Sequence, residues 1–230
     1  MWQAQAQADA ALVQAALRRH QFPTKCAGRR KLLYAYSQAF GFGAHAHMLS
    51  LALNLALYTD RVLVPVDEES WWLVKEEECG RAGFSCFFQD FTHCSVTAEE
   101  RAASPPFLTL GASAFASSGG PDNVLFDWEG QTHAIKVGFL RHYVPNIPGQ
   151  TRRRGAAWWR GQLLQMLMQP RPWLSNELAR SKRAMGWEEP VLGLHVRHGD
   201  KLKEANRLAA RDYLRVLLPV AKAQGAMFRV

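Results

Sequence analysis

The chain has 230 residues, and because 48% of them are hydrophobic it can bury the core of one large or two modest domains, which argues against an intrinsically disordered protein. Its formal net charge of +8 favours partners that carry phosphate or carboxylate groups. The basic residues are spread along the chain, and the densest run, residues 152–154, has no aromatic side chains between them, which argues against a nucleic-acid-binding protein.

An N-terminal segment, residues 1–23, is predicted to form a surface helix because Ala, Leu and Val recur at helical spacing from residue 4 to residue 20. The segment has neither the apolar centre nor the cleavage pattern of a secretory signal. No window of the sequence offers the roughly 20 apolar residues that a membrane-spanning helix needs. We therefore expect no membrane anchor within this chain.

A parallel βαβ unit is predicted next. Residues 31–36 and 61–66 are short apolar runs typical of buried strands, and residues 44–58 carry apolar side chains on almost every side, as a buried helix does. The turn between the first strand and the helix contains Gly41, Phe42 and Gly43. Its glycines either serve only the turn or let a ligand approach the backbone.

Three cysteines, Cys79, Cys86 and Cys94, lie in a loop-rich stretch of residues 67–123, and Cys26 precedes the first predicted strand. An even number of cysteines indicates two disulfides and an oxidising compartment. A zinc site is the alternative, although the sequence has no Cys-x-x-Cys pair and only His93, beside Cys94, stands at a ligand-like spacing. Inert thiols are a further alternative.

The first domain is expected to span residues 24–186 and to end in a helical connector. Its remaining predicted elements are strands at residues 124–126 and 133–137 and helices at residues 158–169 and 173–185. Pro170 and Pro172 precede the second helix, where proline is tolerated.

A second domain is predicted to occupy residues 187–230. It begins with a strand at residues 191–196, which has the composition of a buried parallel strand, and continues into a helix at residues 207–223. One strand and one helix cannot cover both faces of a parallel sheet, so we expect this domain to be incomplete in the chain.

The loop that follows the strand at residues 191–196 holds the most informative side chains. In open α/β sheets, ligands bind at the carboxyl ends of the strands, and this loop supplies cations and carboxylates there: Arg197, His198, Asp200, Lys201 and Glu204. A guanidinium binds two phosphate oxygens at once, and cations aimed at a departing diphosphate stabilise the charge that grows in the transition state. A nearby carboxylate can remove the proton of an attacking hydroxyl.

The same loop also has a purely structural interpretation. Asp200 with Lys201 or Arg197 can form a surface ion pair worth at most about 1 kcal/mol. His195, at the end of the strand, can be a hydrogen-bonded core histidine.

Four stretches of the sequence together resemble the α1,6-fucosyltransferases, glycosyltransferase family 23. They are residues 26–36 with the Gly41–Gly43 turn and the helix after it, the aromatic and cysteine stretch that ends at Cys94, residues 158–173, and LGLHVRHGDK at residues 192–201. The resemblance implies an inverting enzyme that transfers fucose from GDP-fucose to the innermost N-acetylglucosamine of N-glycans. It also implies a GT-B-like α/β fold, in which an open α/β domain precedes the start of a truncated Rossmann-like donor domain.

The resemblance also implies residue roles. Arg197 falls on the arginine that holds the donor β-phosphate, and Asp200 and Lys201 fall on members of the same loop. Glu204 is the nearest match to the catalytic base, and His198 replaces the second arginine usual in vertebrate members. The remaining residues assigned to donor binding are His195, Gly41, Phe42 and Gly43. No metal or other cofactor is expected, which agrees with the absence of an Asp-x-Asp motif from the sequence.

Cysteine pairing and localisation follow from the same resemblance. It implies disulfides that join Cys26 to Cys94 and Cys79 to Cys86, and it places the protein in the Golgi lumen. The alternatives are a catalytically inactive, truncated remnant that binds a glycan or nucleotide, and a fucosyltransferase that acts on another class of acceptor.

Overall fold

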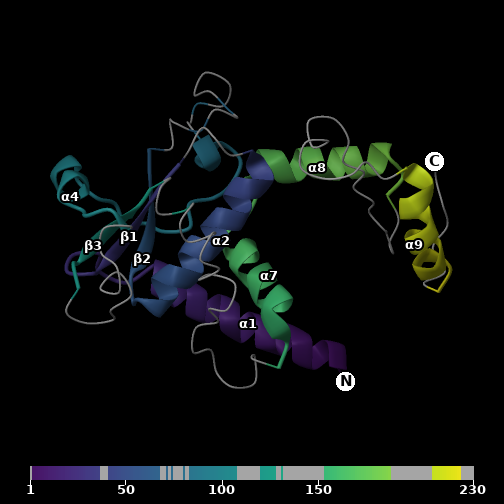
Figure 1. Ribbon diagram of the computed structural model, residues 1–230, viewed down its shortest axis with the longest axis horizontal. Helices are drawn as coiled ribbons and strands as arrows, with labels where there is room; N and C mark the ends of the chain where they lie inside the picture. The colour runs from purple at the N-terminus through teal and green to yellow at the C-terminus, as the bar shows by residue number, and fades with distance from the viewer. Residues whose placement is uncertain are drawn as a thin grey trace. The chain divides into compact units, whose positions relative to one another are not determined.

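The computed structural model describes residues 2–36, 41–67, 71, 74, 80, 83–107, 120–127, 131, 153–187 and 209–223 (Figure 1). They fall into two compact units, Met1–Pro172 and Trp173–Val230. The division lies at the start of the second helix of the predicted connector. The predicted domain boundaries, at residues 23 and 186, stay predictions.

A small parallel sheet forms the centre of the first unit. It contains β1 (Lys31–Ala35), β2 (Val62–Val66) and β3 (Asn123–Phe126) in the order β2-β1-β3. In its register Leu33 of β1 stands opposite Val64 of β2 and Leu125 of β3. All five residues of β1 are buried, as expected of a central parallel strand covered on both faces. The predicted α/β class and the parallel βαβ unit are confirmed.

Three helices of the first unit pack together. The helix α2 (Phe42–Tyr58) connects β1 to β2, and nearly all of its side chains from His45 to Ala56 are buried. In Figure 1, α7 (Gly155–Leu167) lies beside α2 and beside α1 (Trp2–Gln21), and contacts join α7 to both helices. Indole Nε1 of Trp159 donates a hydrogen bond of 2.8 Å to Asn54 Oδ1 between α7 and α2. These helices match the predicted ones within a few residues.

The stretch predicted as loops contains two short helical elements among its described residues. They are the 3-10 helix η2 (Gly83–Cys86) and the helix α4 (Ala98–Ala102). Thr97 and Glu100 form a capping box at the start of α4, because the Thr97 hydroxyl accepts from Glu100 N and the Glu100 carboxylate accepts from Thr97 N. The stretch was predicted to be loop-rich, and these two short elements are additions that the sequence pattern did not predict.

The second unit contributes α9 (Ala210–Ala223) and most of α8 (Pro172–Ala184) to the described residues. Both helices were predicted, and α8 begins at a proline as expected. The predicted strands at residues 133–137 and 191–196 lie outside the described residues. The GT-B-like arrangement and the Rossmann-like second domain stay predictions. None of the helices in the described part of the chain combines the length and the apolar character that crossing a bilayer requires.

Candidate functional site at the carboxyl edge of the sheet

The residues predicted to act on the donor come from two segments. The loop that holds His195, Arg197, His198, Asp200, Lys201 and Glu204 lies outside the described residues. The roles of these six side chains therefore stay predictions. The turn at Gly41, Phe42 and Gly43 lies within the described residues.

The turn lies where β1 delivers the chain to the N-terminus of α2. Since β1 and β2 are parallel and α2 connects them, α2 begins at the carboxyl edge of the sheet. Gly41 is the N-cap, with φ −76° and ψ 172°, and it makes no side-chain cap bond. Gly41, Phe42 and Gly43 are all exposed. The amides of a first helical turn have no intrahelical partners, and together with the helix dipole they favour an anion such as phosphate.

Neither glycine is required by the backbone or by packing. Among the described glycines with positive φ, neither Gly41 nor Gly43 occurs. A Cβ atom added to either residue would meet nothing within 4 Å. Gly41 serves as the N-cap, a position where glycine is common. The open space at both glycines leaves both interpretations standing, the turn alone and close approach of a ligand to the backbone.

An aromatic cluster surrounds the turn. Phe42 is 43% exposed, and its ring centroid lies 6.1 Å from that of Phe88 in a stacked arrangement and 6.4 Å from that of Trp71. Beneath them Tyr36 contacts both Trp71 and Phe84 through its ring. Sequence analysis missed this cluster because its members come from separate segments, and no spacing in the sequence connects them.

His45 belongs to the buried side of this cluster. Its side chain is fully buried, and Nδ1 lies 3.2 Å from the hydroxyl of Tyr34, with which it forms a hydrogen bond. Burial raises the pKa of the Tyr34 hydroxyl far above its usual range, so this group stays protonated. His45 therefore acts as a packing residue in the first two turns of α2.

Gln131 ties together the carboxyl ends of two strands. Its buried amide Nε2 donates hydrogen bonds of 2.9 Å to the carbonyl oxygen of Ala35 and 2.8 Å to that of Phe126. These acceptors are the last residues of β1 and β3. The bonds hold the sheet edge in one geometry beside the turn. An isolated glutamine carries no sequence signal for such a role.

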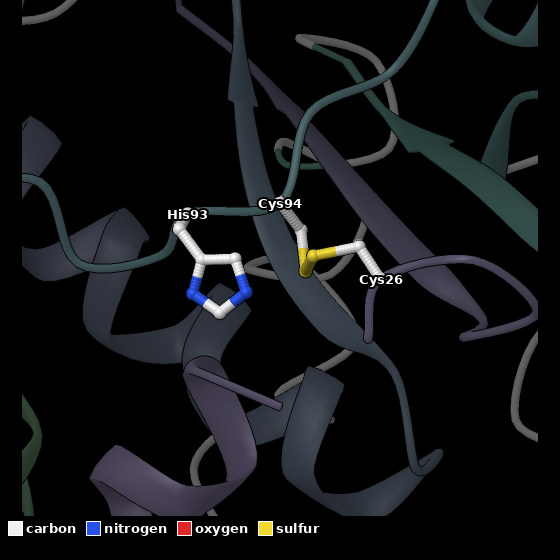
Figure 2. Close-up of side chains that lie close together, drawn as sticks. All are labelled: Cys26, His93 and Cys94. Carbon is white, nitrogen blue, oxygen red and sulfur yellow. A yellow bond between two sulfur atoms is a disulfide. The ribbon is translucent and has the colours of Figure 1, made fainter. Parts of the chain in front are cut away.

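A disulfide joins Cys26 to Cys94, as predicted (Figure 2). The imidazole of His93 lies beside it, and one ring nitrogen and both sulfur atoms lie within 4.8 Å of one another. Because the two sulfurs are bonded to each other, the disulfide interpretation holds for this pair, and the cysteines are not present as thiolate ligands for zinc. Cys86 is buried and disulfide-bonded, but Cys79 lies outside the described residues, so the pairing of these two cysteines stays a prediction.

Comparison with known proteins gives two findings. The family model of the alpha-(1,6)-fucosyltransferase N- and catalytic domains matches residues 135–217, a range that contains the loop from His195 to Glu204. An alpha-(1,6)-fucosyltransferase of Drosophila melanogaster is 25% identical over 220 residues, and the match covers 88% of this chain but 31% of that protein. The chain thus spans about a third of the length of this relative. The predicted resemblance to the α1,6-fucosyltransferases is confirmed.

Proposed function

We propose that this chain is part of an inverting fucosyltransferase that transfers fucose from GDP-fucose to the innermost N-acetylglucosamine of N-glycans. The observation that carries the proposal is the family match over residues 135–217, because it includes the cationic loop that sequence chemistry assigns to the donor diphosphate. The likeness to a fruit-fly protein named as an alpha-(1,6)-fucosyltransferase supports the same activity.

The donor diphosphate is proposed to contact two sources of positive potential. Arg197 binds phosphate oxygens through its planar guanidinium, with Lys201 and His198 adding positive charge and His195 completing the donor-binding set. The exposed first turn of α2, at Gly41, Phe42 and Gly43, is the other proposed source, through its backbone amides. Since these cations and amides can neutralise the leaving GDP, the proposal requires no metal ion.

The transfer step needs one base. Glu204 or Asp200 removes the proton of the acceptor hydroxyl while that oxygen forms a bond to the anomeric carbon of fucose. The bond from the same carbon to the diphosphate oxygen breaks, and GDP leaves with the electron pair. Attack on the face opposite the leaving group inverts the configuration at the anomeric carbon.

The secretory pathway is the proposed location, with the Golgi lumen as the specific compartment. The disulfide between Cys26 and Cys94 supports it, because such bonds form and persist in oxidising compartments. The acceptor, a glycan attached to protein, is found in the same compartments.

The test is turnover of nucleotide sugars by a protein that contains this sequence, with release of GDP as the measured product. We expect GDP-fucose to be the preferred donor and Arg197→Ala to abolish transfer. Arg197→Lys is expected to retain only part of the activity of the unaltered protein, because an ammonium cannot form the bidentate hydrogen bonds of a guanidinium.

Arg215→Ala serves as the matched control, since Arg215 is an exposed arginine that pairs with Asp212 at 3.5 Å on α9. Full transfer by the Arg197→Ala protein would refute the proposed role. Absence of both turnover and GDP binding in the unaltered protein would instead support the inactive remnant.

A further inference from the structure

A pocket of about 340 Å³ opens beside the carboxyl end of β2. Its lining includes none of the three residues of the Gly41–Gly43 turn. The volume lies at the small end of the range of about 300 to 1,000 Å³ that is usual for small-molecule sites, so it suits one or two sugar-sized units. Among the residues that line it are Val66, Asp67, Phe84, Asp90, Phe91 and Arg101.

A charged pair lies in the pocket wall. The guanidinium of Arg101 on α4 donates a hydrogen bond to the carboxylate of Asp67, the residue that follows β2. Asp67 has φ 57°, in the left-handed region that few residues other than glycine adopt. Backbone conformations of this kind concentrate at binding and catalytic sites, where the surrounding structure holds them. Both side chains are partly exposed, at 44% for Arg101 and 25% for Asp67, so a ligand can reach them.

The floor of the pocket is apolar. Phe84, Phe91 and Val66 are all buried, and they line the same pocket as the charged pair. A sugar ring has the complementary pattern, since one face carries C–H groups and its rim carries hydroxyls. A carboxylate accepts from such hydroxyls and a guanidinium donates to them, so the pair can bind neighbouring hydroxyls of one ring.

The charged side chains of the pocket do not favour a phosphorylated ligand. Among the described residues that line the pocket, the ionisable side chains are two carboxylates, Asp67 and Asp90, and one guanidinium, Arg101. Asp67 is paired with Arg101, and Asp90 is paired with Arg171, so these described side chains leave no unpaired cation to attract a phosphate or diphosphate. A neutral, hydroxyl-rich ligand needs no such cation.

The walls of the pocket are tied to the rest of the first unit. The disulfide at Cys94 anchors one segment, and the buried Thr92 hydroxyl donates a hydrogen bond of 2.8 Å to the carbonyl oxygen of Gln21. Arg171 holds the start of the same segment through a hydrogen bond of 3.1 Å to Asp90. A pocket held in this way is largely formed before its ligand arrives, which limits the entropy lost on binding.

We propose that this pocket binds a neutral sugar unit of the acceptor glycan, with Asp67 and Arg101 as the residues that contact its hydroxyls. The inference rests on the proposed function, because a glycosyltransferase must hold an acceptor as well as a donor. It assigns the acceptor a subsite beside β2, apart from the donor residues at the Gly41–Gly43 turn.

The experiment is saturation-transfer NMR of the 230-residue chain with N,N′-diacetylchitobiose and a mannose trisaccharide, followed by titration of the sugar that binds. Arg101→Ala and Asp67→Asn are each expected to weaken its binding about tenfold, since hydrogen bonds to charged groups are lost. Asn tolerates the left-handed backbone, so the second variant preserves the fold at residue 67.

Arg29→Ala and Asp60→Asn are the matched controls. They break a similar surface pair, at 3.3 Å, and Asp60 also has a positive φ of 48°, but neither residue lines the pocket. Both controls should bind sugar as the unaltered chain does. Sugar binding that is absent, or that Arg101→Ala leaves unchanged, would overturn the inference, as would stronger binding of inorganic phosphate or of an extended peptide in this pocket.

GDP-fucose binding is measured on the same samples so that the two proposals fail separately. Donor binding without any sugar binding would remove the pocket inference and leave the proposed function standing. Sugar binding that depends on Arg101 without any donor binding would support the pocket and contradict the proposed function.

Discussion

At Gly43, a glycine that the fold requires can be distinguished from a glycine that ligand binding requires. It stands in the first turn of α2 with an ordinary φ and open space where a Cβ atom would be. Alanine therefore fits its backbone and its packing, and alanine has the higher helix propensity. If Gly43 strengthens donor binding, it must do so by leaving free the space that the methyl group of an alanine would occupy.

We predict that Gly43→Ala raises the free energy of unfolding by about 0.5 to 1 kcal/mol and weakens GDP-fucose binding. Urea unfolding and calorimetric titration measure the two effects on one sample. Gly161→Ala is the control, because Gly161 is also a helical glycine with nothing within 4 Å of an added Cβ. The control should gain stability and leave donor binding unchanged, and unaltered donor binding in both variants would contradict the proposed role of the turn.

The contacts of several side chains at the sheet edge could not be predicted from any pattern in the sequence. Gln131 bonds to the ends of two strands, and Asp67 meets Arg101 across 34 positions of the chain. These contacts arise from the tertiary fold, in which segments distant in sequence meet at one sheet edge. Gly41, Phe42 and Gly43 could be found because their glycines immediately precede a strongly apolar helix. Arg197 was predicted for the analogous reason, as a cation that follows a predicted buried strand, and its role stays a prediction.

Helices and strands were predicted where burial dominates the local sequence. The runs in β1, β2 and α2 are almost wholly apolar, so their periodicity and composition identify both the element and its partners. The helix α4 was missed because it has no buried residue and hence no apolar pattern. Its capping box at Thr97 and Glu100 was the available signal.

A buried ion pair joins α1 to the start of α7. Arg154 Nε donates a hydrogen bond of 2.7 Å to the carboxylate of Asp9, and the two side chains are only 13% and 5% exposed. Hydrogen bonds from Gln5 and then from Arg154 lower the pKa of Asp9 below 3.8. Because the folded state holds the ionised form, this carboxylate stabilises the fold above the unfolded pKa, and the contribution is lost as the pH falls through the lower folded pKa.

We predict that Asp9→Asn lowers the free energy of unfolding at neutral pH and makes it fall less steeply with acid below pH 3.8. Urea unfolding over a series of pH values gives both quantities. Asp60→Asn is the comparison, since the Asp60 side chain is 67% exposed, and we expect it to lower the free energy of unfolding at neutral pH less than Asp9→Asn does. A steeper acid loss in Asp9→Asn than in the unaltered chain would contradict this account of the pair.

Viewed as a whole, the chain divides into two units that differ in how much the sequence could predict. The first unit has a sheet, three packed helices and the disulfide between Cys26 and Cys94, and sequence and resemblance together predicted each of them. The disulfide could not be assigned from spacing alone, because four cysteines allow three pairings. For the second unit, α8 and α9 match prediction. The roles assigned to the side chains of the loop that contains Arg197 stay predictions.

The Cys26–Cys94 disulfide closes a long loop, since 68 positions separate the two residues. We predict that the double variant Cys26→Ala, Cys94→Ala lowers the free energy of unfolding by about 4 kcal/mol under oxidising conditions, chiefly by freeing the unfolded chain. Urea unfolding with and without reductant measures the difference, which should nearly vanish when both proteins are reduced. Equal stability of the two proteins without reductant would show that this bond does not hold the unit together.

The central claim is that the guanidinium of Arg197 binds the diphosphate of a sugar nucleotide. Calorimetric titration of GDP-fucose into the unaltered chain, Arg197→Ala and Arg215→Ala tests it most directly, because binding is measured without turnover. We predict binding by the unaltered chain and by Arg215→Ala, and at least about tenfold weaker binding by Arg197→Ala. Equal affinity of Arg197→Ala and the unaltered chain, or no binding by either, would contradict the claim.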